Sequence, residues 1–235
     1  MKKYIILIVF LAIFSSLHSQ TNFQLHYDFG NARNYFTTTV ETFKPDKWGN
    51  TFLFVDIDYN GDTNHYPSMA YMEIARCLKF WEAPFSAQIE YNGGMASAGN
   101  TYFPINHAFL AGVDYEWHSG DFTKFLNFKI LYKYIHEKHP VSLQFTAVWN
   151  LNFFKNKFTV SGFADFWRED NTNYTNARGN DITPTNTKFV FMTEPQFWYN
   201  VTEHLSLGSE IEITNNFGTV HGLKICPTIA AKWIF

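Results

Sequence analysis

Cysteine is scarce in this sequence of 235 residues, which contains only Cys77 and Cys226. Small secreted proteins that depend on disulfides carry many more cysteines, so a disulfide-based scaffold is excluded. Charge of one sign is also missing, because the formal net charge is -3 and no run of basic or acidic residues occurs. Proteins that bind nucleic acids need a basic surface, so neither DNA nor RNA is expected as a partner.

Long apolar runs are absent as well, apart from one short stretch near the N-terminus. Residues 4–14 are apolar, follow a pair of lysines and precede small polar residues. This layout is typical of a secretory signal, so residues 1–19 are predicted to be a cleaved signal peptide. The alternative is a membrane anchor, but a helix needs about 20 apolar residues to cross a bilayer. Residues 20–235 are predicted to form a single domain.

Aromatic residues are abundant. They make up 20% of the chain, with 26 Phe, 13 Tyr and 7 Trp, although the mean hydropathy is only -0.21. A water-soluble domain rarely needs so many rings, whereas outer-membrane barrels carry aromatic girdles at both membrane interfaces.

Apolar and polar residues alternate along most of the chain, which indicates β-strands. In the C-terminal segment, Ile225, Ile229 and Trp233 share one face, and Lys224 and Lys232 share the other. The alternation predicts strands at 22–30, 35–44, 50–60, 69–80, 85–95, 104–117, 122–135, 141–152, 157–168, 187–199, 204–214 and 223–235. Most can cross a bilayer at a tilt, which takes about 9–11 residues. The predicted fold is all-β, a transmembrane antiparallel β-barrel of the outer-membrane type with about 12 strands. The alternative, a soluble β-sandwich or lipocalin-like barrel, has shorter strands.

The connections between these strands support the same topology. Every second connection is short, as in "PDKWGN", "WEAP" and "FKNK", and the others include the longer stretches 95–103 and 169–186. Because outer-membrane barrels have short periplasmic turns and longer outer loops, the chain is expected to end at the periplasmic side. Phe235, at the end of an alternating strand, is predicted to be recognised by the barrel-assembly machinery. The expected periplasmic girdle consists of Trp48, Phe80, Trp81, Trp117, Phe153, Phe154, Tyr199 and Trp233.

The stretch "VDIDYNGDTNHYP" has the spacing of an EF-hand calcium loop, with Asp56, Asp58 and Asn60 at the first, third and fifth positions. An EF-hand also needs flanking helices and a bidentate Glu at the twelfth position, which here is Pro67. We therefore expect no specific metal site and no cofactor. A weak surface site formed by Asp58, Asn60 and Asp62 stays open as an alternative.

The inner face of the predicted barrel is acidic and aromatic. Its predicted carboxylates are Asp28, Glu41, Asp56, Asp58, Glu73, Glu90, Asp114, Glu116, Asp165, Glu194, Glu210 and Glu212, against Lys129, Lys133, Lys188, Lys224 and Lys232. Lumen residues determine what passes, so anions should be disfavoured. Rings beside carboxylates suit a ring-bearing polar solute, since stacking a base on an aromatic side chain contributes about 1–3 kcal/mol. The predicted path is lined by Phe52, Phe54, Asp56, Glu73, Glu90, Asp114, Phe163, Asp165, Trp167 and Trp198. The alternative is that these side chains simply fill a narrow barrel.

Several segments in matching order resemble the nucleoside-specific channel-forming (Tsx-like) porins and their uncharacterised outer-membrane relatives. They are "KPDKWGNTFLFVDIDY", "MEIARCLKF", "FSAQIEYNGG", "SGFADFW" and "PTIAAKWIF". The resemblance implies a monomeric twelve-stranded barrel through which nucleosides and deoxynucleosides cross the outer membrane. It further implies lining roles for Phe54, Asp56, Glu73, Glu90, Phe163 and Trp167.

The sequence therefore predicts an integral outer-membrane channel for passive uptake of small polar solutes, above all nucleosides. A non-selective or closed structural barrel is one alternative. Another alternative is an enzyme that resembles outer-membrane phospholipase. In that phospholipase, the catalytic His is followed by a nearby Ser. Here "INHAFLAGVD" provides Asn106 and His107 without such a serine, so no catalytic residues are expected.

Overall fold

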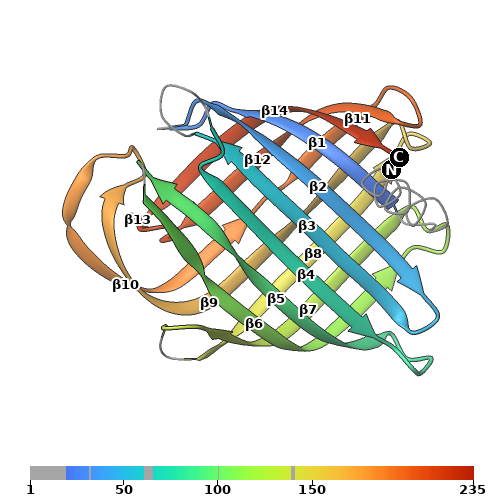
Figure 1. The fold of residues 1–235 in the computed structure, drawn as a ribbon. Coiled ribbons are helices and arrows are strands. Elements are labelled where there is room, and N and C mark those ends of the chain that lie inside the picture. The colour runs from blue at the N-terminus through green and yellow to red at the C-terminus, as the bar shows by residue number, and fades with distance from the viewer. Residues whose placement is uncertain (1–19, 32, 61–65, 100, 139–140) are drawn as a thin grey trace, which may run out of the picture.

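The computed structural model describes residues 20–31, 33–60, 66–99, 101–138 and 141–235. Within these ranges the chain forms one closed β-barrel and no helix (Figure 1). The predicted signal peptide, residues 1–19, lies outside the described residues. In the described part of the chain, no helix has the length and apolar character needed to cross a membrane.

The barrel wall has twelve strands, as the sequence predicts. The strands are β1 (Gln20–Asp28), β2 (Tyr35–Asp46), β3 (Gly49–Tyr59), β4 (Met69–Leu78), β5 (Phe85–Ala98), β6 (Thr101–His118), β7 (Lys124–Ile135), β8 (Ser142–Phe153), β9 (Phe158–Asn176), β10 (Asp181–Thr193), β11 (Gln196–Asn200), β12 (Leu205–Asn215), β13 (Val220–His221) and β14 (Leu223–Ile234). β10 and β11 form one wall strand, because both pair with β9 and β12. β13 has only two residues and lies outside the wall order, paired with β9.

The ring closes between the first and last strands of the described chain. β1 pairs with β2 on one side and with β14 on the other, and β14 continues the ring to β12. All neighbouring wall strands are antiparallel, and the short β13 pairs with β9 in parallel. A closed ring leaves no strand edge exposed, which is what a β-structure in lipid requires.

The two faces of the wall differ as the alternation predicts. The outer face presents exposed apolar side chains, among them Leu25, Val40, Ile74, Ile89, Phe109, Val113, Ile130, Phe145, Leu207 and Ile229. The inner face buries polar side chains, among them Asn22, Gln24, His26, Asp28, Gln88, Asn92, Asp114, Lys133, Gln144 and Thr228. This arrangement suits a protein whose outer surface contacts lipid and whose core is the lumen.

The two ends of the barrel differ in their connections. We call the end with the short connections 47–48, 79–84, 119–123, 154–157 and 201–204 the turn end, and the opposite end the loop end. The chain terminus lies at the turn end, where the Phe235 amide donates a hydrogen bond to the Thr21 carbonyl at 3.0 Å. Aromatic side chains cluster there: the ring centroids of Trp48 and Phe80 are 5.5 Å apart, and Trp81 packs beside Phe80. These contacts fit the predicted girdle.

Two expected long connections are mostly strand. β5 and β6 leave only residues 99–100 between them where a connection over 95–103 was expected, and β9 and β10 extend far into 169–186. The Thr and Asn residues of these stretches pair across hairpins, as in the side-chain hydrogen bond between Thr172 and Asn186 at 3.0 Å. A polar stretch that lacks the apolar alternation of a lipid-facing strand therefore still forms a hairpin, which here projects beyond the barrel at the loop end (Figure 1).

The expected continuous strand 187–199 is also interrupted. Pro195 separates β10 from β11 and has no amide hydrogen to donate to the ladder. The break is bridged from both sides, because the Glu194 amide donates to Phe163 at 3.1 Å and the Ile211 amide donates to Pro195 at 3.0 Å.

The loop end can be assigned to a side of the membrane with trypsin. Arg178 is exposed in the turn between β9 and β10, so intact cells treated with trypsin should lose the full-length chain by cleavage after Arg178. The Arg178→Gln variant should resist, which makes it the matched control. Cleavage of intact cells at Lys155 or Lys157, both exposed in a turn at the opposite end, would reverse the expected orientation.

Candidate functional site: the barrel lumen

The strand register places all ten predicted lining residues on the inner face. They come from β3 (Phe52, Phe54, Asp56), β4 (Glu73), β5 (Glu90), β6 (Asp114), β9 (Phe163, Asp165, Trp167) and β11 (Trp198). On this face Phe54 lies opposite Glu73, and Ser86 lies opposite Asp114. Their surroundings differ, however, so they do not form one continuous surface.

Three rings form a half-buried aromatic corner on β3 and β4. The centroids of Phe52 and Phe54 are 6.0 Å apart, and those of Phe54 and Tyr71 are 6.1 Å apart. The Tyr71 hydroxyl donates a 2.6 Å hydrogen bond to Glu73. Sequence reasoning missed Tyr71, although its position two residues before Glu73 places it on the same face of β4. Rings and a carboxylate thus meet here, as the sequence predicts.

Trp167 offers no open ring face, in contrast to its predicted role as a stacking surface. Its side chain is only 4% exposed, and the Lys133 ammonium lies 3.9 Å from the ring centroid. The same ammonium donates a 2.6 Å hydrogen bond to Gln144. A cation over an aromatic face is favourable, and more so where water is excluded. The lysine therefore occupies the face that a solute would need.

Trp198 is covered in the same way and is fully buried. The Lys232 ammonium lies 4.1 Å from its ring centroid, and His26 meets its ring edge-on at 6.1 Å. Its indole nitrogen donates to Gln196 at 2.9 Å. Both tryptophans therefore lie on the inner face, as predicted, but their rings are covered and do not form the expected stacking surfaces.

The carboxylates of the lumen are mostly held by neutral donors. Asp56 accepts a 2.5 Å hydrogen bond from Thr39, and Asp165 accepts one of the same length from Thr146. Glu90 is bonded by Gln88 at 2.6 Å. These neutral donors satisfy hydrogen-bond acceptors of the carboxylates but bring no positive charge to them, so the inner face stays richer in acidic than in basic side chains. Sequence reasoning missed these donors because uncharged polar residues carry no signal of their own.

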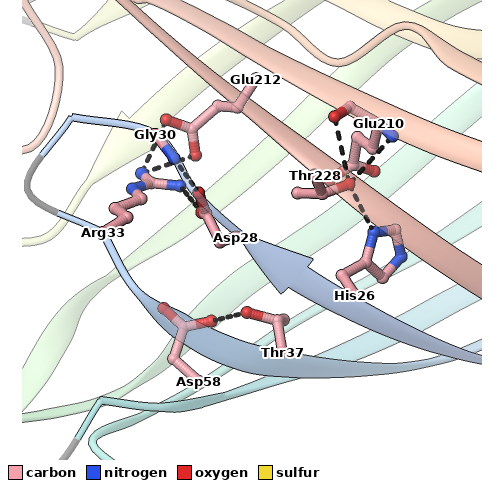
Figure 2. Close-up of polar contacts among 9 residues, drawn as sticks. All are labelled: His26, Asp28, Gly30, Arg33, Thr37, Asp58, Glu210, Glu212 and Thr228. Carbon is pink, nitrogen blue, oxygen red and sulfur yellow. Dashed lines mark hydrogen bonds and ion pairs between the residues drawn. The ribbon is translucent and has the colours of Figure 1, made fainter.

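The loop end of the lumen is narrowed by two connections. Arg33, from the connection between β1 and β2, pairs with Asp28 and Glu212 inside the mouth (Figure 2). From the connection between β12 and β14, Phe217 packs edge-on against Trp167 at 6.1 Å. Sequence reasoning treated both segments only as connections, since nothing in a loop sequence shows that it folds inward.

The turn end of the lumen contains a pocket. A pocket of about 390 Å³ lies between the first turns, lined by Phe43, Pro45, Asp46, Lys47, Gly49, Asn50, Cys77, Lys79, Trp81, Pro84, Phe85, Ser86, Glu116 and Phe125. Asn50 and Cys77 are register partners on the inner face. The pocket is therefore the turn-end mouth of the lumen.

The described residues do not show the geometry that either alternative, a metal site or a phospholipase-like enzyme, would need. In the described ranges, no cluster of three His, Cys, Asp or Glu side chains could hold a metal ion. Asp58 accepts a 2.7 Å hydrogen bond from Thr37, and Asp62, the third ligand of the weak site left open above, lies outside the described residues. His107 lies 2.6 Å from the Tyr91 hydroxyl. Its partner is thus a phenol rather than a serine.

Comparison with known sequences places the chain in a family. The profile of a domain of unknown function, DUF5020, matches residues 20–235. The chain belongs to the DUF5020 family. No curated protein sequence matches it.

Two solved porins share the fold of this DUF5020 chain. A NanC porin is 10% identical, with 92% of this chain and 99% of the porin covered and a TM-score of 0.58. A KdgM porin, solved in complex with disordered oligogalacturonate, is 8% identical with the same coverage and a TM-score of 0.50. At such identities the likeness shows the fold alone, which is that of the outer-membrane porins. The predicted outer-membrane location of the DUF5020 chain agrees with this fold and with its apolar outer face.

Proposed function

We propose that this barrel is an outer-membrane channel for small solutes that are neutral or cationic, with nucleosides as the preferred class. The observation that carries this proposal is the inner face itself. It joins an aromatic corner at Phe52, Phe54 and Tyr71 to the carboxyl group of Glu73, which accepts a hydrogen bond from Tyr71. The porin fold supports the general role of a channel for small solutes.

The charge of the lumen argues for this class of solute. Acidic side chains outnumber lysines on the inner face, and a ring of carboxylates favours cations over anions. The KdgM porin was solved with oligogalacturonate, a chain of acidic sugars. Because the inner face is richer in acidic than in basic side chains, we expect a polyanion of that kind to be disfavoured, and the solute proposed here differs from the one solved with the KdgM porin.

The aromatic corner argues for a solute with a ring. Phe52 and Phe54 are half-buried, and among the described residues no lysine lies over their rings, in contrast to Trp167 and Trp198. A nucleoside base stacked there would gain about 1–3 kcal/mol, and Glu73 can accept hydrogen bonds from ribose hydroxyls or base amino groups.

Flux measurements on Phe54→Ala test this proposal. Loss of the ring should remove about 1–3 kcal/mol of binding, so nucleoside flux at low concentration should fall in proteoliposomes. Ion conductance should stay equal or rise, because the path becomes wider. Phe109→Ala is the matched control, since Phe109 is an exposed ring on the outer face. A parallel rise of nucleoside and ion flux would instead indicate a non-selective acidic porin.

A closed structural barrel is the second candidate, and specific contacts favour it. Lys133 and Lys232 lie over buried tryptophans, and Arg33 is ion-paired at the loop end, so much of the lumen is filled by its own side chains. A planar-bilayer recording separates the two candidates, because a closed barrel passes no current.

We further propose that Phe235 directs the chain to the barrel-assembly machinery. Phe235 is 74% exposed, and its amide donates a hydrogen bond to the Thr21 carbonyl. Its ring is therefore available to a partner before and after the barrel closes.

A further inference from the structure

Arg33 stands out because it belongs to a connection but ends inside the barrel mouth. Its Nη1 lies 2.8 Å from Asp28 Oδ2, and its Nη2 lies 2.8 and 2.9 Å from the two carboxylate oxygens of Glu212. Figure 2 shows the guanidinium between the two carboxylates, which project from β1 and β12. One cation thus links two wall strands that are separated by β14.

The connection is held against the inner wall at Gly30. A methyl group at this position would fall 2.7 Å from the Cys226 Cα and 2.8 Å from its Sγ, so only glycine allows this close approach. The Gly30 amide donates a 3.0 Å hydrogen bond to Asp28. Cys226 is the register partner of Glu212 and is fully buried. Gly30 therefore covers Cys226 and keeps Arg33 over the carboxylates.

The two carboxylates and the guanidinium differ in how firmly they are held. Asp28 and Glu212 lie on paired wall strands, and their side chains are 4% and 16% exposed. The Arg33 side chain is 21% exposed and extends from a connection. Two carboxylates that accept the fork of a guanidinium form a charge-assisted arrangement that a free guanidinium can reproduce. The more exposed partner is the one that a solute can replace.

We propose that Arg33 sets cation specificity at the loop end. Its guanidinium is an internal ligand of Asp28 and Glu212, and guanidinium-bearing solutes compete with it for these two carboxylates. This inference deepens the proposed channel function and rests on it. A solute that binds there must displace Arg33, and neutral solutes have no means to do so. The two carboxylates therefore select, among cations, those that match the fork of arginine, whereas neutral solutes such as nucleosides pass the mouth without binding to them.

Guanidinium chloride at millimolar concentration is the probe for this exchange. In planar bilayers, Arg33→Ala should conduct better than the wild type and should be blocked by free guanidinium about tenfold more strongly, as expected for a vacated charge-assisted hydrogen-bond site. Adding Glu212→Gln to Arg33→Ala should remove the block. Arg33→Lys, which keeps the charge and loses the fork, should lie between wild type and Arg33→Ala. Equal block in wild type and Arg33→Ala would overturn the proposal.

A second measurement uses the native thiol and does not depend on an Arg33 variant. In a Cys77→Ser background, Cys226 is the single cysteine and lies beneath Gly30. Free guanidinium should speed its reaction with a small neutral thiol reagent, whereas tetramethylammonium, which cannot donate hydrogen bonds, should not. Equal rates with both cations would overturn the inference.

The two measurements separate this inference from the proposed function. If the barrel passes no current but guanidinium speeds the labelling of Cys226, the proposed channel function is contradicted and the competition of guanidinium with Arg33 is supported. A barrel that conducts and shows no guanidinium effect would contradict the role of Arg33 alone.

Discussion

Deletion of Phe235 is expected to remove most of the folded barrel from the outer membrane. The residue adds one backbone hydrogen bond, to Thr21, and a ring that is 74% exposed, so its loss should cost the finished barrel little stability. If the exposed ring is the recognition signal, assembly should fail before closure. The amount of folded protein can be measured by heat-dependent mobility in gels of outer-membrane fractions.

The matched controls for this deletion are Phe235→Tyr, which keeps a terminal ring, and Phe235→Ala, which keeps the backbone hydrogen bond. Phe235→Tyr should assemble normally, and Phe235→Ala should behave like the deletion. Normal outer-membrane levels of the deletion variant would contradict the proposed role of the ring.

Replacement of Gly208 by Val is expected to destabilise the barrel and to rearrange the lumen. Gly208 lies between Trp198 on β11 and Ala230 on β14, and a Cβ there would fall 2.6 Å from the Trp198 ring and 2.1 Å from the Phe197 carbonyl oxygen. Forcing extra atoms into such a site typically costs about 1–3 kcal/mol. The Trp198 ring should move off Lys232 toward the lumen, so single-channel conductance should fall together with the unfolding temperature.

Gly120→Ala is the control for Gly208→Val, because no atom lies within 4 Å of a Cβ at Gly120. It should leave both conductance and unfolding temperature unchanged. Adding Trp198→Leu to Gly208→Val should recover part of the lost conductance, since the ring is then absent. If Gly208→Val keeps the wild-type conductance, the room that Gly208 provides for Trp198 is not what shapes the lumen.

The barrel can be predicted from the sequence because the alternation of apolar and polar residues within each strand shows which side chains face outward and which face inward. Ile225, Ile229 and Trp233 alternate with Lys224 and Lys232, and the structure places the first group outside and the second inside. The same local rule puts every predicted lining residue on the inner face. In the distal part of the β9–β10 hairpin, which projects beyond the barrel at the loop end, the strands are polar and the apolar alternation is lost (Figure 1).

The covering of the tryptophans could not be predicted, because it depends on strands that are not neighbours in sequence. Lys232 reaches Trp198 across the intervening strand β12, over a position where Gly208 has no side chain. Nothing in the sequence near Trp198 indicates a lysine above it. Arg33 escaped prediction for a related reason, since its partner Glu212 is 179 residues away.

The seam between β1 and β14 limits the order in which the strands of the barrel can pair. His26 on β1 and Thr228 on β14 are in hydrogen-bond contact although 202 residues separate them. Contacts between such distant segments form slowly, because a long loop must close before they are gained. The pairing of β1 can therefore be completed only after the last strand has been synthesised. Until this seam closes, the free edge of β1 can pair with a strand of another chain, so closure of the seam also protects the barrel from aggregation.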